Sequence, residues 1–209
     1  MEETRILGVI LTGGSSKRFG ADKSAAQLGG KTLLEWVIER ARPQVERLLL
    51  NANSDTASTS VIERLADDRP GEGPLAGILA ALEKAQETNL THVASFACDT
   101  PFFPRDTVER LSRALYDSRA DYSVARCGGT VHRIFALWRV SHRPRLQAAF
   151  AADARSMRSI ENWLAPAWAD FVPESGPGGD PFFNINTRAD LATAESWMSK
   201  NPPENQLRA

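Results

Sequence analysis

Apolar runs alternate with amphipathic segments along most of this chain. Residues 6–11, Ile-Leu-Gly-Val-Ile-Leu, contain no polar side chain, as expected for a strand that is buried on both faces of a parallel sheet. Comparable patterns predict further strands at residues 47–51, 92–98, 121–126, 134–138 and 169–172.

Two amphipathic segments carry clear signals for the start of a helix. Thr32 and Glu35 have the spacing of a capping box, and the helix that they open should end before Pro43. Thr187, with Asp190 three residues later, predicts the cap of the last helix. Local side-chain chemistry therefore predicts both of these helix starts.

Further helices follow from proline positions and apolar spacing. Proline is favoured in the first turn of a helix, so Pro74 and Pro104 predict two more starts. Weaker patterns predict partly helical structure at residues 54–66 and short helices at 141–150 and 155–164. Strands that alternate with helices indicate a three-layer α/β/α fold with a mainly parallel sheet. The middle third departs from simple alternation, so we expect the sheet to be partly mixed.

Length, charge and cysteine content restrict the class of protein. The 209 residues fit one domain, which we place at residues 1–200, and we expect the polar tail at 201–209 to be disordered. The net charge of −1 favours neither nucleic acid nor an anionic membrane, and no apolar run approaches the roughly 18 residues that span a bilayer. Cys98 and Cys127 lack the spacing of a metal or disulfide motif. We therefore expect a cytoplasmic protein.

The clearest candidate for chemistry directly follows the first strand. Residues 11–23 read Leu-Thr-Gly-Gly-Ser-Ser-Lys-Arg-Phe-Gly-Ala-Asp-Lys. Glycines such as Gly13 and Gly14 let backbone N–H groups approach phosphate oxygens. Arg18 can grip a phosphate with two donors, and Lys23 adds a compact charge. The spacing fits neither a Walker A loop nor the dinucleotide pattern GxGxxG, so the segment predicts a phosphate-binding turn of another kind.

This turn resembles the signature of nucleotidyltransferases of the sugar-nucleotide type and, within them, the molybdenum cofactor guanylyltransferase family. Nearly the whole chain shares the likeness, because four further blocks occur in the order and spacing of that family: Asn51-Ala-Asn53, Gly73-Pro-Leu-Ala-Gly77, Cys98-Asp-Thr-Pro-Phe102 and Asn184-Ile-Asn-Thr187.

The resemblance implies a fold, a reaction and partners. It implies a Rossmann-like fold and a magnesium-dependent enzyme that transfers GMP from GTP to molybdopterin carrying molybdenum, with release of pyrophosphate. Molybdoenzyme chaperones or apoenzymes that receive the product would be protein partners. The implied catalytic residues are Arg18, Lys23 and Asp99, and the implied substrate-binding residues are Leu11, Thr12, Gly13, Gly14, Lys23, Asn51, Asp67, Gly77, Asp99, Asn184 and Asn186.

Local chemistry agrees with a metal-binding role for Asp99. The residue follows an apolar strand and so places a carboxylate at the edge of the sheet. Mg²⁺ is typically held by one or two carboxylates together with phosphate oxygens and water, so one aspartate can suffice. The alternative is that Asp99 caps the helix predicted near Pro104.

Asp67 is the candidate for reading the base. A carboxylate can accept hydrogen bonds from the N1–H and amino group of guanine, and it would leave a buried charge unpaired against adenine. The tandem Asp67-Asp68 leaves open which of the two occupies the position of the family, and a solvated turn is the alternative.

Three other candidates have structural alternatives. Gly77 would let the start of a helix approach the substrate, or would serve helix geometry alone. Asn184 and Asn186 alternate along an extended segment, so both amides would face one side. They would bind phosphate or the acceptor, or only close the turn before Thr187.

The segment 131–158 also attracts interest, through its charge. It contains six arginines (Arg133, Arg139, Arg143, Arg145, Arg155 and Arg158) against one acidic residue, Asp153. This excess suits an anionic acceptor or a protein partner, and a solvated helical face is the alternative. His132, near the end of a glycine-containing turn, would lie on the acceptor side or would be a solvent-facing turn residue.

Two other functions compete with the guanylyltransferase interpretation. A cytidylyltransferase of the same superfamily would share the phosphate-binding turn and consume CTP. A regulatory module that binds a nucleotide without catalysis belongs to another class, and the presence of both Lys23 and Asp99 argues against it.

Overall fold

The structure is a computed structural model that describes residues 4–12, 26–52, 62–66, 72–173 and 176–201. Within these ranges no helix is both long and apolar enough to cross a bilayer. The principal elements, in chain order, are β1 (Ile6–Leu11), β2 (Gln27–Leu28), β3 (Lys31–Thr32), α1 (Leu33–Ala41), β4 (Arg47–Asn51), β5 (Glu63–Leu65), α2 (Pro74–Glu87), β6 (His92–Ala97), α3 (Thr107–Ser118), β7 (Tyr122–Cys127), β8 (Thr130–Arg139), α4 (Arg143–Ala151), β9 (Pro166–Phe171) and α5 (Arg188–Lys200).

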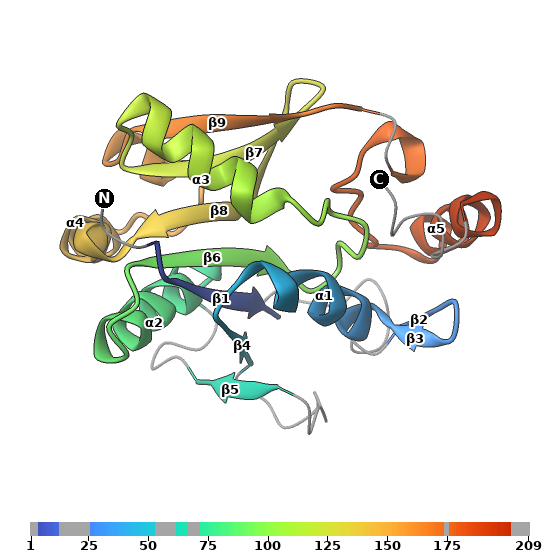
Figure 1. Cartoon of the computed structure of the whole chain (residues 1–209), viewed down its shortest axis with the longest axis horizontal. Coiled ribbons are helices and arrows are strands. Elements are labelled where there is room, and N and C mark those ends of the chain that lie inside the picture. The colour runs from blue at the N-terminus through green and yellow to red at the C-terminus, as the bar shows by residue number, and fades with distance from the viewer. Residues whose placement is uncertain (1–3, 13–25, 53–61, 67–71, 174–175, 202–209) are drawn as a thin grey trace.

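In the described part of the chain, seven strands form one sheet in the order β5-β4-β1-β6-β8-β7-β9. Of these seven, only β8 runs against its neighbours, since β6 and β7 both pair with it in antiparallel fashion and β9 pairs with β7 in parallel. Six strands therefore end at the same edge of the sheet (Figure 1). We call this edge the carboxyl rim and define it by the last residues of those strands: Leu11, Asn51, Leu65, Ala97, Cys127 and Phe171.

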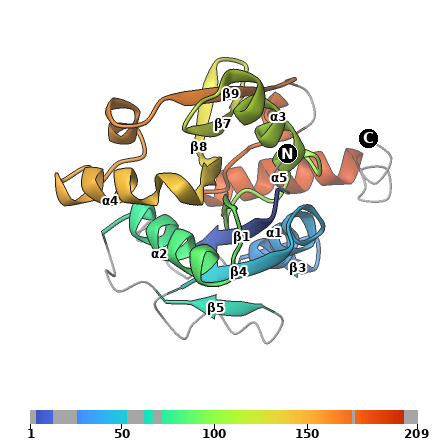
Figure 2. The same ribbon diagram turned by 60° about the vertical axis from the view of Figure 1, so that its left-hand side comes forward.

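Helices cover both faces of the sheet, as Figure 2 shows for α2 and α4 on one side and α1 and α3 on the other. The alternation of a strand explains the two cores, because Val9 of β1 packs with the α2–α4 side and Ile10 with the α1–α3 side. The predicted three-layer α/β/α fold with a mainly parallel, partly mixed sheet is confirmed.

A third, smaller apolar cluster attaches α5 to the rest of the molecule. Leu28 and Leu33, from the β2–β3 hairpin and α1, pack with Phe102 and Ile185 and with Ala194 of α5. Capping boxes start both helices as predicted: Thr32 with Glu35 for α1, and Thr187 with Asp190 for α5.

Several predicted elements were wrong in type or extent. Residues 63–65 form an edge strand that pairs with residues 49–51 of β4, whereas the segment 54–66 was expected to be partly helical. In the segment 155–164 only Ser159–Asn162 forms a turn of 3-10 helix, although Ile160 is fully buried. The helix expected to begin at Pro104 begins at Thr107.

The connection between β7 and β8 is tighter than predicted. Gly128 and Gly129 both adopt positive φ angles, of 53° and 85°, which suits a two-residue hairpin turn. Strand β8 consequently begins at Thr130 rather than at Ile134. Its register with β7 jumps from Val124–Ala136 to Ala125–His132, so that residues 133–135 form a bulge.

Candidate functional site

The carboxyl rim brings the ends of β1, β4 and β6 together. Leu11 is paired with Asn51 on one side and with Ala97 on the other, and the Cys98 N–H donates to the Leu11 carbonyl over 3.3 Å. The chain leaves β1 toward β4 and later returns to β6 on the other side of β1. Such a switch in strand order is where open α/β sheets bind ligands.

Thr12 fixes the start of the glycine-rich segment to β4. Its N–H and its Oγ1 both donate to the carbonyl of Asn51, over 3.2 and 2.7 Å. The side chain of Asn51, only 6% exposed, donates through Nδ2 to the carbonyl of Leu65 over 3.1 Å. One residue thus ties together the points at which the chain enters residues 13–25 and residues 67–71.

Five of the predicted site residues cannot be placed. Gly13, Gly14, Arg18, Lys23 and Asp67 lie outside the described residues, as does Asp68. Their roles stay predictions.

Gly77 makes room for the side chain of Asn51. It lies in the first turns of α2 and is buried. A β-carbon at this position would overlap Asn51 Oδ1 and lie 2.9 Å from Leu11 Cδ2. The helix therefore approaches the rim more closely than any residue with a side chain would allow.

Gly73 sets the direction from which α2 arrives. Its φ of 84° and ψ of −177° belong to a region that is accessible essentially to glycine alone. Pro74 follows at the first helical position, where a missing N–H costs no hydrogen bond. The Gly-Pro-Leu-Ala-Gly block thus has a structural reason for each of its glycines and for its proline.

Asp99 lies two residues beyond the end of β6, with a half-buried side chain. Thr100 Oγ1 donates to Asp99 Oδ1 over 3.4 Å, and the Asp99 carbonyl accepts from the N–H of Ile185 over 2.9 Å. The capping alternative is excluded, because α3 begins at Thr107 and its N-cap is Asp106.

The segment after Asp99 is held from α1 by a residue that sequence reasoning missed. Arg40 is 7% exposed and donates from Nη1 to the Phe103 carbonyl over 3.2 Å. Burial, with a smaller contribution from the nearby charge of Arg105, lowers the pKa of Arg40 to about 10. Gln44 Nε2 donates to the next carbonyl, that of Pro104, over 3.3 Å. No local sequence signal marks a buried arginine in a helix.

Asn184 and Asn186 flank Ile185, which is held both by its backbone N–H and by its side chain. The N–H of Ile185 is bonded to Asp99, and its side chain is fully buried. Asn184 is exposed and Asn186 half-buried, while Asp190 Oδ2 accepts from the Asn186 N–H over 2.9 Å. The structure therefore brings both asparagines beside Asp99.

His132 lies inside strand β8, so the expectation of a solvent-facing turn histidine is wrong. Its side chain is only 13% exposed, its Nε2 lies 3.2 Å from Asp180 Oδ2, and its ring stacks on Phe182 with centroids 4.7 Å apart. Burial lowers the pKa of His132, and the neighbouring Asp180 opposes that effect.

Acidic side chains from other segments pair with several arginines of the 131–158 stretch. Arg133 pairs with Glu161 over 2.9 Å, Arg145 with Asp121 over 2.6 Å and Arg143 with Glu83 over 3.1 Å. Arg155 approaches Glu72 and Asp153, at 3.7 and 3.4 Å, and the Arg139 guanidinium lies over the ring of Tyr116. Four of the six arginines thus have acidic partners, which reduces the local excess of positive charge. Arg133 and Arg139 lie on strand β8, so the stretch is not a single solvated helical face.

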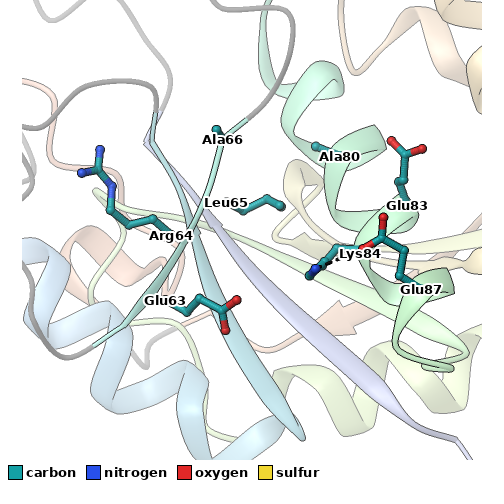
Figure 3. Close-up of a pocket in the computed structure, with 8 residues that line it drawn as sticks. All are labelled: Glu63, Arg64, Leu65, Ala66, Ala80, Glu83, Lys84 and Glu87. Carbon is teal, nitrogen blue, oxygen red and sulfur yellow. Dashed lines mark hydrogen bonds and ion pairs between the residues drawn. The ribbon is translucent and has the colours of Figure 1, made fainter.

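A polar hollow of about 270 Å³ lies between β5 and α2 (Figure 3). Its lining residues are Glu63, Arg64, Leu65, Ala66, Ala80, Glu83, Lys84 and Glu87. None of the predicted site residues that the structure describes lines it, although its lining residue Leu65 ends β5 at the rim and accepts a hydrogen bond from Asn51.

The donor set at the rim is suited to a magnesium ion that arrives with phosphate. The described part of the chain contains no group of three or more His, Cys, Asp or Glu side chains placed to hold a metal. Mg²⁺ does not require such a group, since it keeps several waters and takes substrate oxygens. A half-buried carboxylate at Asp99, beside the strand that leads into the glycine-rich segment, fits this mode of binding.

Comparisons with known proteins agree with this geometry. The family model described as "MobA-like NTP transferase domain" matches residues 8–167. The molybdenum cofactor guanylyltransferase of Rhodobacter capsulatus is 39% identical over 202 residues, covering 95% of this chain and all of that protein. The enzyme of the same name from Rhizobium meliloti is 40% identical over 200 residues, covering 91% of this chain and 90% of that one.

A solved structure with a related name has a similar fold. The crystal structure of molybdopterin-guanine dinucleotide biosynthesis protein A from Archaeoglobus fulgidus superposes with a TM-score of 0.72 at 26% identity, covering 93% of this chain and 99% of that chain.

Proposed function

Because this chain belongs to the MobA-like NTP transferase family, we propose that it transfers GMP from GTP to molybdopterin carrying molybdenum, forming the guanine dinucleotide cofactor and pyrophosphate. The observation that supports this most directly is the convergence of Thr12, Asn51, Asp99 and the Asn184–Asn186 segment on one rim, in a chain that matches curated guanylyltransferases over nearly its whole length.

The nucleotide occupies the β1–β4 half of the rim in this proposal. Thr12 and Asn51 fix the start of the glycine-rich segment, from which backbone N–H groups, Arg18 and Lys23 bind the triphosphate. Asp67 accepts hydrogen bonds from guanine and so excludes adenine.

The reaction is a single displacement at the α-phosphorus. A terminal phosphate oxygen of the acceptor forms the new O–P bond as the bond to the bridging oxygen of pyrophosphate breaks. That nucleophile is already ionised at neutral pH, so no protein base is required. Positioning and charge stabilisation by Arg18 and Lys23 supply most of the catalysis.

Asp99 is the residue that would hold magnesium. Bound there together with phosphate oxygens and water, the ion would offset the negative charge that develops on the α-phosphate and on the departing pyrophosphate. The Ile185–Asp99 hydrogen bond fixes the backbone that carries this carboxylate.

The test is a product assay with purified protein, molybdenum-loaded molybdopterin, Mg²⁺ and either GTP or CTP. We expect release of pyrophosphate and formation of the guanine dinucleotide with GTP only. Consumption of CTP instead would favour the cytidylyltransferase alternative. Binding of GTP without turnover, under conditions in which a known guanylyltransferase is active, would favour the regulatory module.

A further inference from the structure

His132 and Asp180 connect the hairpin of β7 and β8 to the segment that leads into α5. The two side chains come within 3.2 Å, and the Nε2 atom of His132 is buried with no hydrogen-bond partner in line. In Figure 1 the segment between β9 and α5 lies at the end of the sheet to which the tips of β1 and β6 point. The contact is therefore at the carboxyl rim.

Asp180 also organises the residues that follow it. Its second oxygen, Oδ1, accepts from the N–H of Phe182 over 2.8 Å, and its carbonyl accepts from the N–H of Phe183 over 3.1 Å. The Phe182 ring then packs on His132 and, at 4.9 Å between centroids in each case, on Phe135 and Phe171. A single carboxylate thus turns the chain and directs one aromatic side chain into the core.

Three residues after Phe182, the same segment makes contact with Asp99. Ile185 donates its N–H to the Asp99 carbonyl over 2.9 Å. The position of Asn184 is consequently set at one end by the Asp180–Phe182 turn and at the other by Ile185. A shift of Asp180 would move Asn184 relative to Asp99.

The two halves of the rim contribute different elements. Thr12 and Asn51 come from β1 and β4, on one side of β6, whereas His132 and Asp180 come from β8 and from the segment after β9, on the other side. The first half contains the residues assigned to GTP, so the second half is left to the acceptor.

We propose that His132 and Asp180 form a clasp that positions Asn184 and Asn186 for the acceptor, which makes His132 a positioning residue for acceptor binding rather than for GTP. This inference rests on the proposed function for the identity of the acceptor. The clasp itself is a property of the fold.

Burial makes the clasp sensitive to substitution. Burial lowers the pKa of His132, and the neighbouring Asp180 opposes that effect, so the ring and the carboxylate influence each other directly. Removing the imidazole takes away both the 3.2 Å contact with Asp180 Oδ2 and the ring on which Phe182 stacks. Glutamine can place an amide donor near the position of Nε2, whereas alanine cannot.

The test compares His132→Ala, His132→Gln and Asp180→Ala with Asp170→Asn. Asp170 is a matched control, because it is an aspartate of β9 whose carboxylate is engaged in an exposed ion pair with Arg126. Two quantities are measured: amide hydrogen exchange at Phe182 and Ile185, and the KM for molybdopterin and for GTP in the pyrophosphate assay.

We expect His132→Ala and Asp180→Ala to speed exchange at both amides and to raise the KM for the acceptor about tenfold. The KM for GTP should stay within about twofold. His132→Gln should restore both the exchange rates and the KM for the acceptor most of the way to the wild-type values. Asp170→Asn should behave as wild type. Unchanged exchange in the alanine variants would overturn the clasp, and an equal rise in both KM values would overturn its assignment to the acceptor. The exchange measurement needs no substrate, so failure of the proposed function, seen as an inactive wild-type protein, is distinguishable from failure of the clasp.

Discussion

The side-chain oxygen of Asn51 lies in the space that a β-carbon on Gly77 would need. Asn51 also holds Thr12 at the start of the glycine-rich segment and Leu65 at the end of β5. Helix α2 and three strand ends therefore meet at one buried residue, through its main-chain carbonyl and its side-chain amide. Disturbing this contact should weaken nucleotide binding more than it lowers the stability of the fold.

Gly77→Ala tests that relationship. The added methyl group must displace Asn51 or Leu11, at a cost of about 1–3 kcal/mol in the free energy of unfolding. We expect the KM for GTP to rise about tenfold, because the start of the glycine-rich segment moves with Asn51. Steady-state kinetics and urea unfolding check both effects. Ala80→Ser, on the same helix, is the control, and similar kinetics in the two variants would contradict the prediction.

Asp99→Asn tests the carboxylate at the end of β6. The amide is the same size and preserves the backbone bond to Ile185, so the fold should be retained. Loss of the negative charge should lower kcat by about 100-fold or more. Asp106→Asn, in the same connection but engaged with Arg110, should keep nearly wild-type turnover. An active Asp99→Asn enzyme would remove the metal-binding role.

Metal removal should separate activity from stability. The proposed ion arrives with substrate phosphates and is held by one protein carboxylate, so the nucleotide-free protein gains little stability from it. We expect EDTA to abolish pyrophosphate release and added Mg²⁺ to restore it, with the midpoint of thermal unfolding unchanged by EDTA. A large fall in that midpoint would indicate a structural metal instead.

His92, at the opposite end of the sheet, should make stability depend on pH. Its burial, together with the charge of Arg139, lowers its pKa to about 4. As the pH falls below about 6.5, the unfolded chain binds a proton that the folded chain refuses, so the free energy of unfolding decreases, by about 2 kcal/mol at pH 5.

His92→Gln should remove this component of the pH dependence. Urea unfolding at pH 7.5 and pH 5 should then show a smaller loss of stability for the variant than for the wild type. Equal losses in the two proteins would show that His92 does not control the effect.

Sequence patterns predicted the elements whose signals are local. The uncharged run of β1 and the capping box at Thr32 specify their structures without help from distant residues. Residues 63–65 gave no such signal, because Glu63 and Arg64 are exposed and only pairing with β4 makes them a strand. The start of α3 was missed for a similar reason, since the carbonyl of Pro104 accepts from Thr107 and forms a turn before the helix.

The candidate site likewise contains residues that local motifs predicted and contacts that they did not. Asp99 and the Asn184–Asn186 segment were predicted from motifs at the ends of strands or before a helix, and the structure places them together. The contacts of Arg40 with Phe103 and of His132 with Asp180 join residues 48 or more positions apart. Such contacts exist only once the chain has folded, so no local pattern could reveal them.

The single reversed strand β8 has a consequence for how such a protein can change. Strand β8 lies between two parallel groups, β5-β4-β1-β6 and β7-β9, and runs in the opposite direction to both. The β7-β9 group therefore extends the sheet beyond β6 and leaves the ends of β1, β4 and β6 in place. Everything up to α3 can bind one substrate while everything after it is remodelled around another. Exchange of the second half between homologues is thus a route to altered acceptor specificity that must preserve the packing of α5 on Leu28 and Leu33 and the bond from Ile185 to Asp99.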